Sequence, residues 1–143
     1  MTGFLLDTNV LSEFSRSAVP PNPRVKRWVE SAQTETLFSS VLSLGEIRKG
    51  IDLLPPGKKR HELEGWLDED LNGWFGDNLL PVTRAISERW GSLAARSQQQ
   101  GKPLGSIDGL LAATALEYGL TVVTRNPMHF QDLGVGIFDP WEG

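Results

Sequence analysis

The stretch that decides the fold is Gly3-Phe4-Leu5-Leu6-Asp7-Thr8-Asn9-Val10-Leu11, at the start of the 143-residue chain. Its first half is a short apolar run, which is typical of a strand buried on both faces of a sheet. A helical pattern begins at Thr8, so a strand gives way to a helix at the acidic residue Asp7. In open α/β sheets, binding sites form outside the carboxyl ends of the strands.

The remainder of the chain alternates helical and strand patterns. Helices are predicted around 25–29 and 44–51, and over about 58–75, 83–100 and 106–118, whereas β-rich runs fall at 4–6, 36–38, 79–80, 121–124 and 137–138. This alternation implies an α/β fold with a parallel sheet covered on both faces. Because no repeat or long linker divides the chain, we expect one domain spanning residues 1–143.

Composition excludes several classes of function. The chain has no cysteine, which rules out disulfides and thiolate metal sites, and its two histidines, His61 and His129, argue against a zinc site. A net charge of −4 does not support a general polyanion-binding surface. No signal peptide or membrane span is recognisable, so we expect a soluble, cytoplasmic protein without membrane association.

One local basic stretch has two interpretations. It consists of Arg48, Lys49, Lys58, Lys59 and Arg60, close in sequence to Glu46. A solvated helix face and loop is the favoured interpretation. The alternative is that these side chains meet the phosphates of a nucleic acid near an acidic centre.

Three acidic residues, Asp7, Glu46 and Asp108, each have a structural explanation when taken singly. Asp7 is a suitable helix N-cap, and Glu46 stands three residues after Ser43, the spacing of a capping box. Asp108 follows Ser106 in the first turn of its helix, where the helix dipole stabilises a negative charge. For any one of them, the structural explanation is preferred.

Taken together, the same three acids predict a metal site. Each is placed where a strand gives way to a helix, so the three helices would enter from one edge of the sheet and bring Asp7, Glu46 and Asp108 into one crevice. Mg²⁺ and Mn²⁺ prefer oxygen ligands, and a water activated by such a metal can hydrolyse a phosphodiester. We therefore expect these three carboxylates to bind the metal and to carry catalysis.

Further polar residues are expected to support the acids. Thr8 and Asn9 are predicted to orient Asp7, and Thr124 to orient a water or a phosphate from a neighbouring strand end. Both threonines are equally well explained as ordinary caps.

At these residues the chain resembles the PIN-domain nucleases, in particular the VapC-type toxins and their FitB-like branch. The resemblance covers nearly the whole chain and keeps the motif order. The matching segments are Leu5-Leu6-Asp7-Thr8-Asn9-Val10-Leu11-Ser12-Glu13, Leu44-Gly45-Glu46-Ile47-Arg48-Lys49-Gly50-Ile51, Ile107-Asp108-Gly109-Leu110-Leu111-Ala112-Ala113-Thr114-Ala115, Val123-Thr124-Arg125-Asn126 and Asp139-Pro140-Trp141-Glu142.

The resemblance implies a three-layer α/β/α sandwich with a central parallel sheet. It also implies a Mg²⁺- or Mn²⁺-dependent endoribonuclease that acts on RNA as the toxin of a type II toxin–antitoxin pair. It further implies a homodimer that is inhibited by a cognate antitoxin. Because the antitoxin of such a pair carries the DNA-binding domain, the toxin would reach operator DNA only through that partner.

The chain departs from the family pattern at one position. The family run Thr-Arg-Asn-x-x-Asp-Phe is represented here by 124–130, and His129 stands at the usual acidic position. Asn126 offers a neutral oxygen and Asp132 lies further on, but neither restores that charge. The number of metal ions that the site binds, one or two, is therefore left open. The missing acid also supports an alternative function: a catalytically weak or inactive PIN-like binding module that acts through a partner protein.

His129 itself has two interpretations. It is either an acid–base or phosphate-contacting group, or a partly exposed loop side chain beside Phe130, which we favour. On the favoured interpretation, His129→Asp preserves or raises metal-dependent RNA cleavage, measured by the rate of product formation in Mg²⁺ or Mn²⁺. A clear loss of activity in the folded variant would show that the histidine takes part in the reaction.

Overall fold

The computed structural model describes residues 3–143 and contains one five-stranded sheet in the order β3-β2-β1-β4-β5, with every neighbouring pair parallel. Leu5 in the central strand pairs with Phe38 on one side and Val122 on the other. The predicted strands and their parallel pairing are thus confirmed. The strands are β1 (Gly3–Leu6), β2 (Leu37–Ser40), β3 (Leu79–Leu80), β4 (Leu120–Val123) and β5 (Ile137–Phe138).

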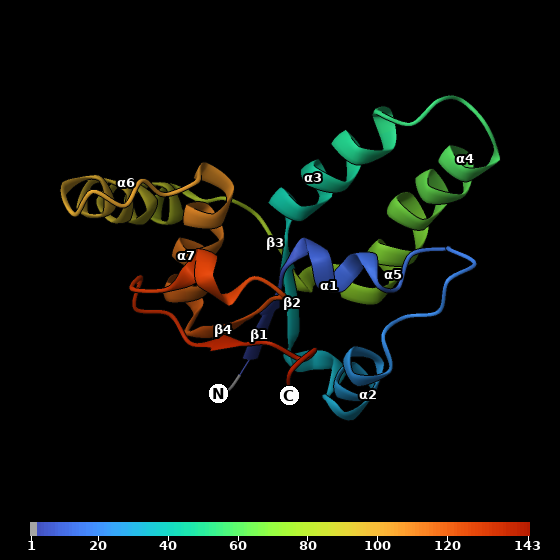
Figure 1. Ribbon diagram of the computed structural model, residues 1–143, viewed down its shortest axis with the longest axis horizontal. Helices are drawn as coiled ribbons and strands as arrows, with labels where there is room; N and C mark the ends of the chain where they lie inside the picture. The colour runs from blue at the N-terminus through green and yellow to red at the C-terminus, as the bar shows by residue number, and fades with distance from the viewer. Residues whose placement is uncertain (1–2) are drawn as a thin grey trace.

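Helices connect the strands and cover the sheet (Figure 1). The helix predicted over 106–118 is confirmed, and it ends at Gly119, whose φ of 64° lies in the left-handed region that favours glycine. The α-helices are α1 (Thr8–Ser12), α2 (Pro23–Ser31), α3 (Val41–Asp52), α4 (Lys58–Gly65), α5 (Leu71–Phe75), α6 (Arg84–Gln99) and α7 (Ser106–Tyr118). Short turns are η1 (Thr34–Thr36), the π-helical η2 (Trp66–Asp70), η3 (Gly76–Asn78) and η4 (Pro127–Phe130).

The helix predicted over 58–75 is not one regular α-helix. Between α4 and α5, the N–H of Leu71 donates to the carbonyl of Trp66, five positions earlier, which makes η2 a π turn. The extra residue in this turn lets both Trp66 and Leu71 face the core, although their spacing exceeds one α-helical turn. The apolar periodicity alone did not reveal this irregularity.

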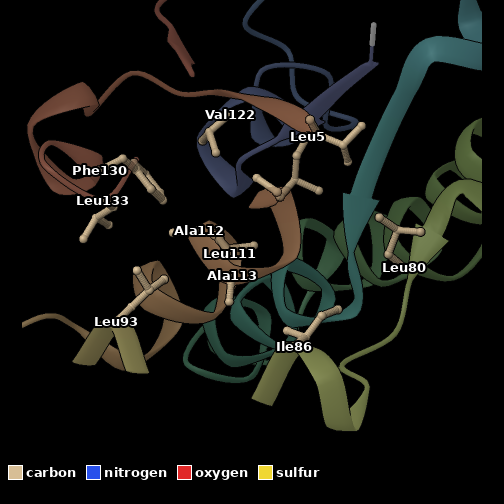
Figure 2. Close-up of a cluster of buried hydrophobic side chains, with 12 residues drawn as sticks. Leu5, Leu80, Ile86, Leu93, Leu111, Ala112, Ala113, Val122, Phe130 and Leu133 are labelled. Atoms are coloured by element: carbon tan, nitrogen blue, oxygen red, sulfur yellow. The ribbon is translucent and has the colours of Figure 1, made fainter. Parts of the chain in front are cut away.

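Adjacent strand residues point to opposite faces of the sheet, and each face has its own core. Leu5 and Val122 belong to a cluster that α6 and α7 cover, and Figure 2 shows these side chains packed with Phe130 and Leu111. The neighbouring Leu6 points to the opposite face of the sheet, which packs against α1, α2, α3 and the α4–α5 segment. The three-layer α/β/α sandwich is therefore confirmed.

Helix length and polarity bear on membrane association. In the part of the chain that the structure describes, no helix is both long enough and apolar enough to cross a membrane.

Two residues of the basic stretch, Arg48 and Arg60, form ion pairs between α3 and the α4–η2 segment. Arg48 contacts Asp52, Glu64 and Asp68 at 3.3–3.8 Å, and Arg60 contacts Asp52 at 3.4 Å. Exposed pairs of this kind contribute at most about 1 kcal/mol each. The contacts agree with the solvated-face interpretation of this stretch.

Close packing of α6 on α7 depends on Gly109. A Cβ atom at this position would lie 2.7 Å from Cδ1 of Trp90 and 2.9 Å from Cδ2 of Leu104. The indole therefore occupies the space that any other residue would fill. Because Gly109 is in the first turn of α7 beside Asp108, this contact also fixes the helix end that carries the acid.

We expect Gly109→Ala to lower the free energy of unfolding by about 1–2 kcal/mol, because the added methyl group overpacks a buried contact. The measurement is urea denaturation followed by circular dichroism. Gly91→Ala is the matched control: nothing lies within 4 Å of a Cβ at this position in α6. There the better helix propensity of alanine should raise stability by roughly 0.5–1 kcal/mol. Equal gains for both variants would contradict the packing argument.

Candidate active site

Asp7 is a buried acid at the carboxyl end of the central strand. Its side chain is largely enclosed, with 8% of the residue surface exposed, and its N–H donates to the carbonyl of Val123 in β4. The carboxylate accepts hydrogen bonds from the Thr8 N–H at 2.8 Å, the Thr124 hydroxyl at 2.8 Å and the Asn9 amide at 3.3 Å. Three donors therefore fix its orientation.

The predicted supporting residues lie around Asp7, but with partly different partners. Asp7 is also the N-cap of α1, so its structural explanation holds alongside the functional one. Asn9 and the Thr8 N–H contact Asp7 as predicted, whereas the Thr8 hydroxyl donates to Oε1 of Glu46 at 2.6 Å. Thr124 was predicted to orient a water or phosphate, but its hydroxyl is donated to Asp7.

Asn126 contacts the site through its backbone N–H. Its N–H donates to Oγ1 of Thr124 at 3.0 Å, and the Asn9 amide also reaches this oxygen at 3.4 Å. The hydroxyl therefore accepts from two donors while donating to Asp7. The predicted oxygen contribution of the Asn126 side chain remains a prediction.

Glu46 is exposed on α3, and its capping-box explanation is wrong. The helix begins at Val41, and its N-cap is Ser40, whose hydroxyl accepts from the Leu42 N–H. Ser43 thus lies inside the helix, where its hydroxyl is buried without a partner among the described residues. Thr8 links Glu46 to the neighbourhood of Asp7.

Asp108 lies in the first turn of α7 as predicted, but no strand precedes it. α7 follows α6 through residues 100–105 and leads into the amino end of β4. A helix that returns to the start of a parallel strand runs against the sheet, so its N-terminus lies at the carboxyl edge. Asp108 therefore reaches the predicted edge by a different connection.

The pKa of Asp108 is raised above its ordinary value. Burial is the main cause; His129 opposes the shift, and the negative charge of Asp7 adds to it. Nδ1 of His129 lies 3.3 Å from Oδ2 of Asp108. His129 is more than half exposed, as a loop side chain would be, yet it also contacts the acid, so the loop interpretation is incomplete.

The donor set fits a hard divalent cation. The negative charge of Asp7 disfavours the charged form of Asp108, and a cation between the two carboxylates would relieve this repulsion. The Glu46 carboxylate, which accepts a hydrogen bond from the Thr8 hydroxyl, would provide a further oxygen ligand for the cation. Within residues 3–143, however, no three acidic or histidine side chains converge closely enough to enclose an ion. The side chains would have to move together to hold one.

Arg125 joins this site to the C-terminal segment, a link that the sequence patterns did not reveal. Its N–H donates to Oδ1 of Asn9 at 3.2 Å, and its guanidinium lies 5.4 Å from the centre of the Trp141 ring. Cation–π contacts of this kind are weakly stabilising. The Arg24 guanidinium bonds the carbonyl of Trp141, which ties α2 to the same segment.

Comparison with known proteins identifies the family. The PIN-domain family model matches residues 4–135. The plasmid stability protein StbB of Pseudomonas syringae pv. tomato is 36% identical over 96% of this chain and 98% of its own. A VapC ribonuclease of Sinorhizobium fredii is 33% identical, and toxin FitB of Neisseria gonorrhoeae is 35% identical, each over 96% of this chain and 97% of its own.

Solved structures agree with the sequence comparison. The crystal structure of FitAcB from Neisseria gonorrhoeae contains a chain that superimposes with a TM-score of 0.88 at 34% identity, over 98% of this chain and 99% of that one. A FitAB complex bound to a DNA fragment gives 0.86 at 33% identity, over 96% and 95%. The chain therefore belongs to the PIN-domain family, within its VapC-type toxin branch.

Proposed function

We propose that this protein is a Mg²⁺- or Mn²⁺-dependent endoribonuclease, the toxin of a type II toxin–antitoxin pair. The observation that carries the proposal is the Asp7 carboxylate, buried and held by Thr124 and Asn9 next to a second acid, Asp108. A carboxylate needed only as a helix cap requires one donor from its own helix. The hydroxyl brought from β4 is an additional constraint that capping does not explain.

In this proposal Asp7, Glu46 and Asp108 are the metal ligands. A bound Mg²⁺ or Mn²⁺ would provide an acidified water and would offset the charge that develops on the phosphate. Thr124 and Asn9 keep Asp7 in one orientation, and Thr8 does the same for Glu46. RNA as the substrate is supported by similarity to the VapC ribonuclease of Sinorhizobium fredii.

The proposed partners follow from the relatives and from the charge of the chain. Similarity to a FitAB complex bound to DNA supports a cognate antitoxin through which this protein reaches operator DNA. The net charge of −4 supports the absence of a DNA-binding surface of its own. A homodimer and a cytoplasmic location belong to the same proposal.

The central test is cleavage of a mixed cellular RNA pool by purified, antitoxin-free protein in Mg²⁺, Mn²⁺ or EDTA. We expect discrete products with either metal and none with EDTA. Asp7→Asn keeps an oxygen that can cap α1 and should reduce the cleavage rate by at least about 100-fold. Loss of a residue that only orients a metal ligand already lowers metal affinity or activity by about 10- to 100-fold, and loss of a ligand should cost more. Asp77→Asn, at an exposed position in η3, is the control for loss of one acid. Parental activity in folded Asp7→Asn would refute the mechanism.

A second test concerns Thr124, whose hydroxyl should matter through Asp7. We expect Thr124→Val to raise the Mn²⁺ concentration for half-maximal cleavage by about 10- to 100-fold, while Thr124→Ser stays near the parent. Both are measured by Mn²⁺ titration of the cleavage rate, with circular dichroism as the check on folding. If valine and serine behaved alike, the hydroxyl would have no orienting role.

The alternative function is a weak or inactive PIN-like binding module that acts through a partner protein. The observation that favours it is His129, which stands at the usual acidic position and lies 3.3 Å from Asp108. Binding of Mn²⁺ or Mg²⁺ with no cleavage, or no binding at millimolar concentration, would support this function. Metal-dependent cleavage that requires Asp7 excludes it.

A further inference from the structure

A cavity of about 490 Å³ opens beside Asp108, between the end of α6, the loop before α7, and the η4 region. This volume is in the range of pockets that hold small ligands. Asp108 forms part of its wall, so an occupant would lie next to the proposed site of cleavage. The residues that give the cavity its chemistry are Gln100, Lys102, Leu104, Met128, His129 and Gln131.

The charged groups of this cavity are matched in pairs. Lys102 lies 3.3 Å from Asp132, and His129 lies 3.3 Å from Asp108. A site for phosphate needs cations in excess of nearby carboxylates. Because Lys102 already faces Asp132 and His129 already faces Asp108, the cavity does not suit a phosphate group.

The uncharged wall has the chemistry that recognises a nucleobase. Leu104, Leu133 and the exposed side chain of Met128 provide apolar surface. Gln100 and Gln131 add two amides, and neither makes a side-chain hydrogen bond within the described residues 3–143. Unpaired bases in RNA are bound in this way, by packing on their faces and by hydrogen bonds to their edges.

The loop that carries Gln131 is held in place. Phe130 and Leu133, on either side of it, are buried in the core, and Asp132 has a φ of 64°, in a left-handed region that aspartate adopts more readily than most residues. Its carboxylate accepts a hydrogen bond from Lys102, in the loop before α7, and both side chains are largely exposed. Gln131 is thus presented from an anchored loop, and Gln100 directly follows the last residue of α6.

We propose that this cavity binds one unpaired nucleobase of the RNA and sets the sequence preference next to the cleaved bond. This inference rests on the proposed ribonuclease function. Gln100 and Gln131 contact the edge of the base, and Met128 packs on its face. Because Asp108 borders both the cavity and the metal ligands, the recognised base belongs to a nucleotide that adjoins the scissile phosphate.

The test is cleavage of a randomised single-stranded RNA pool, followed by sequencing of the product ends. We expect the parent to favour one base at one position adjoining the cut. The double variant Gln100→Ala/Gln131→Ala should reduce this preference by roughly fivefold or more, the lower end of what one bidentate amide–base contact contributes. Gln99→Ala, at the exposed last residue of α6, which does not line the cavity, should keep the preference. An unchanged preference in the double variant would overturn the inference.

A binding measurement separates this inference from the nuclease proposal. Fluorescence anisotropy with labelled five-nucleotide homopolymers in EDTA does not depend on cleavage. The parent should bind one homopolymer at least about fivefold more tightly than the others, and the double variant should bind all four alike. If the parent showed this binding pattern but did not cleave RNA, the nuclease proposal would fail and the base pocket would stand. Equal binding of all four by the parent would overturn the base pocket.

Discussion

Burial of the Asp7 carboxylate is the constraint on which the rest of the site depends. A charged oxygen removed from water must receive hydrogen bonds, or the fold loses several kcal/mol. The N–H of Thr8 comes from α1, the amide of Asn9 from the next residue of the same helix, and the hydroxyl of Thr124 from the end of β4. The acid is therefore satisfied only when β1, α1 and β4 are all in place.

The order of the strands explains how the other acids reach Asp7. β1 lies in the centre of the sheet, with β2 on one side and β4 on the other. The chain leaving β2 enters α3 and delivers Glu46, whereas α7 runs back toward the start of β4 and carries Asp108 at its N-terminus. Gly109 then lets the Trp90 indole press on that helix end. Each acid thus arrives on a different element, and the Thr8 hydroxyl links Glu46 to the residue next to Asp7.

The fold was predictable because its signals are local. Apolar runs such as 4–6 and 121–124 mark the strands, and Gly119 marks the end of α7. The metal-ligand candidates also followed from local position, although the strand expected before Asp108 does not exist. What could not be predicted is pairwise geometry: the Thr8 hydroxyl bonds Glu46, and Thr124 bonds Asp7. These hydrogen-bond partners depend on the directions in which side chains point, which neither residue spacing nor helix and strand propensity encodes. The π turn at η2 was likewise not predictable from the apolar periodicity of 58–75.

The bond between Thr124 and Asp7 joins positions 117 residues apart, so it spans most of the chain. During synthesis from the N-terminus, Asp7 leaves the ribosome long before its β4 partner exists. No nascent or prematurely terminated product that stops before residue 124 can hold the carboxylate in the orientation described here. A cell that makes this protein therefore contains the finished acidic centre only after translation has passed residue 124, and shorter products lack it.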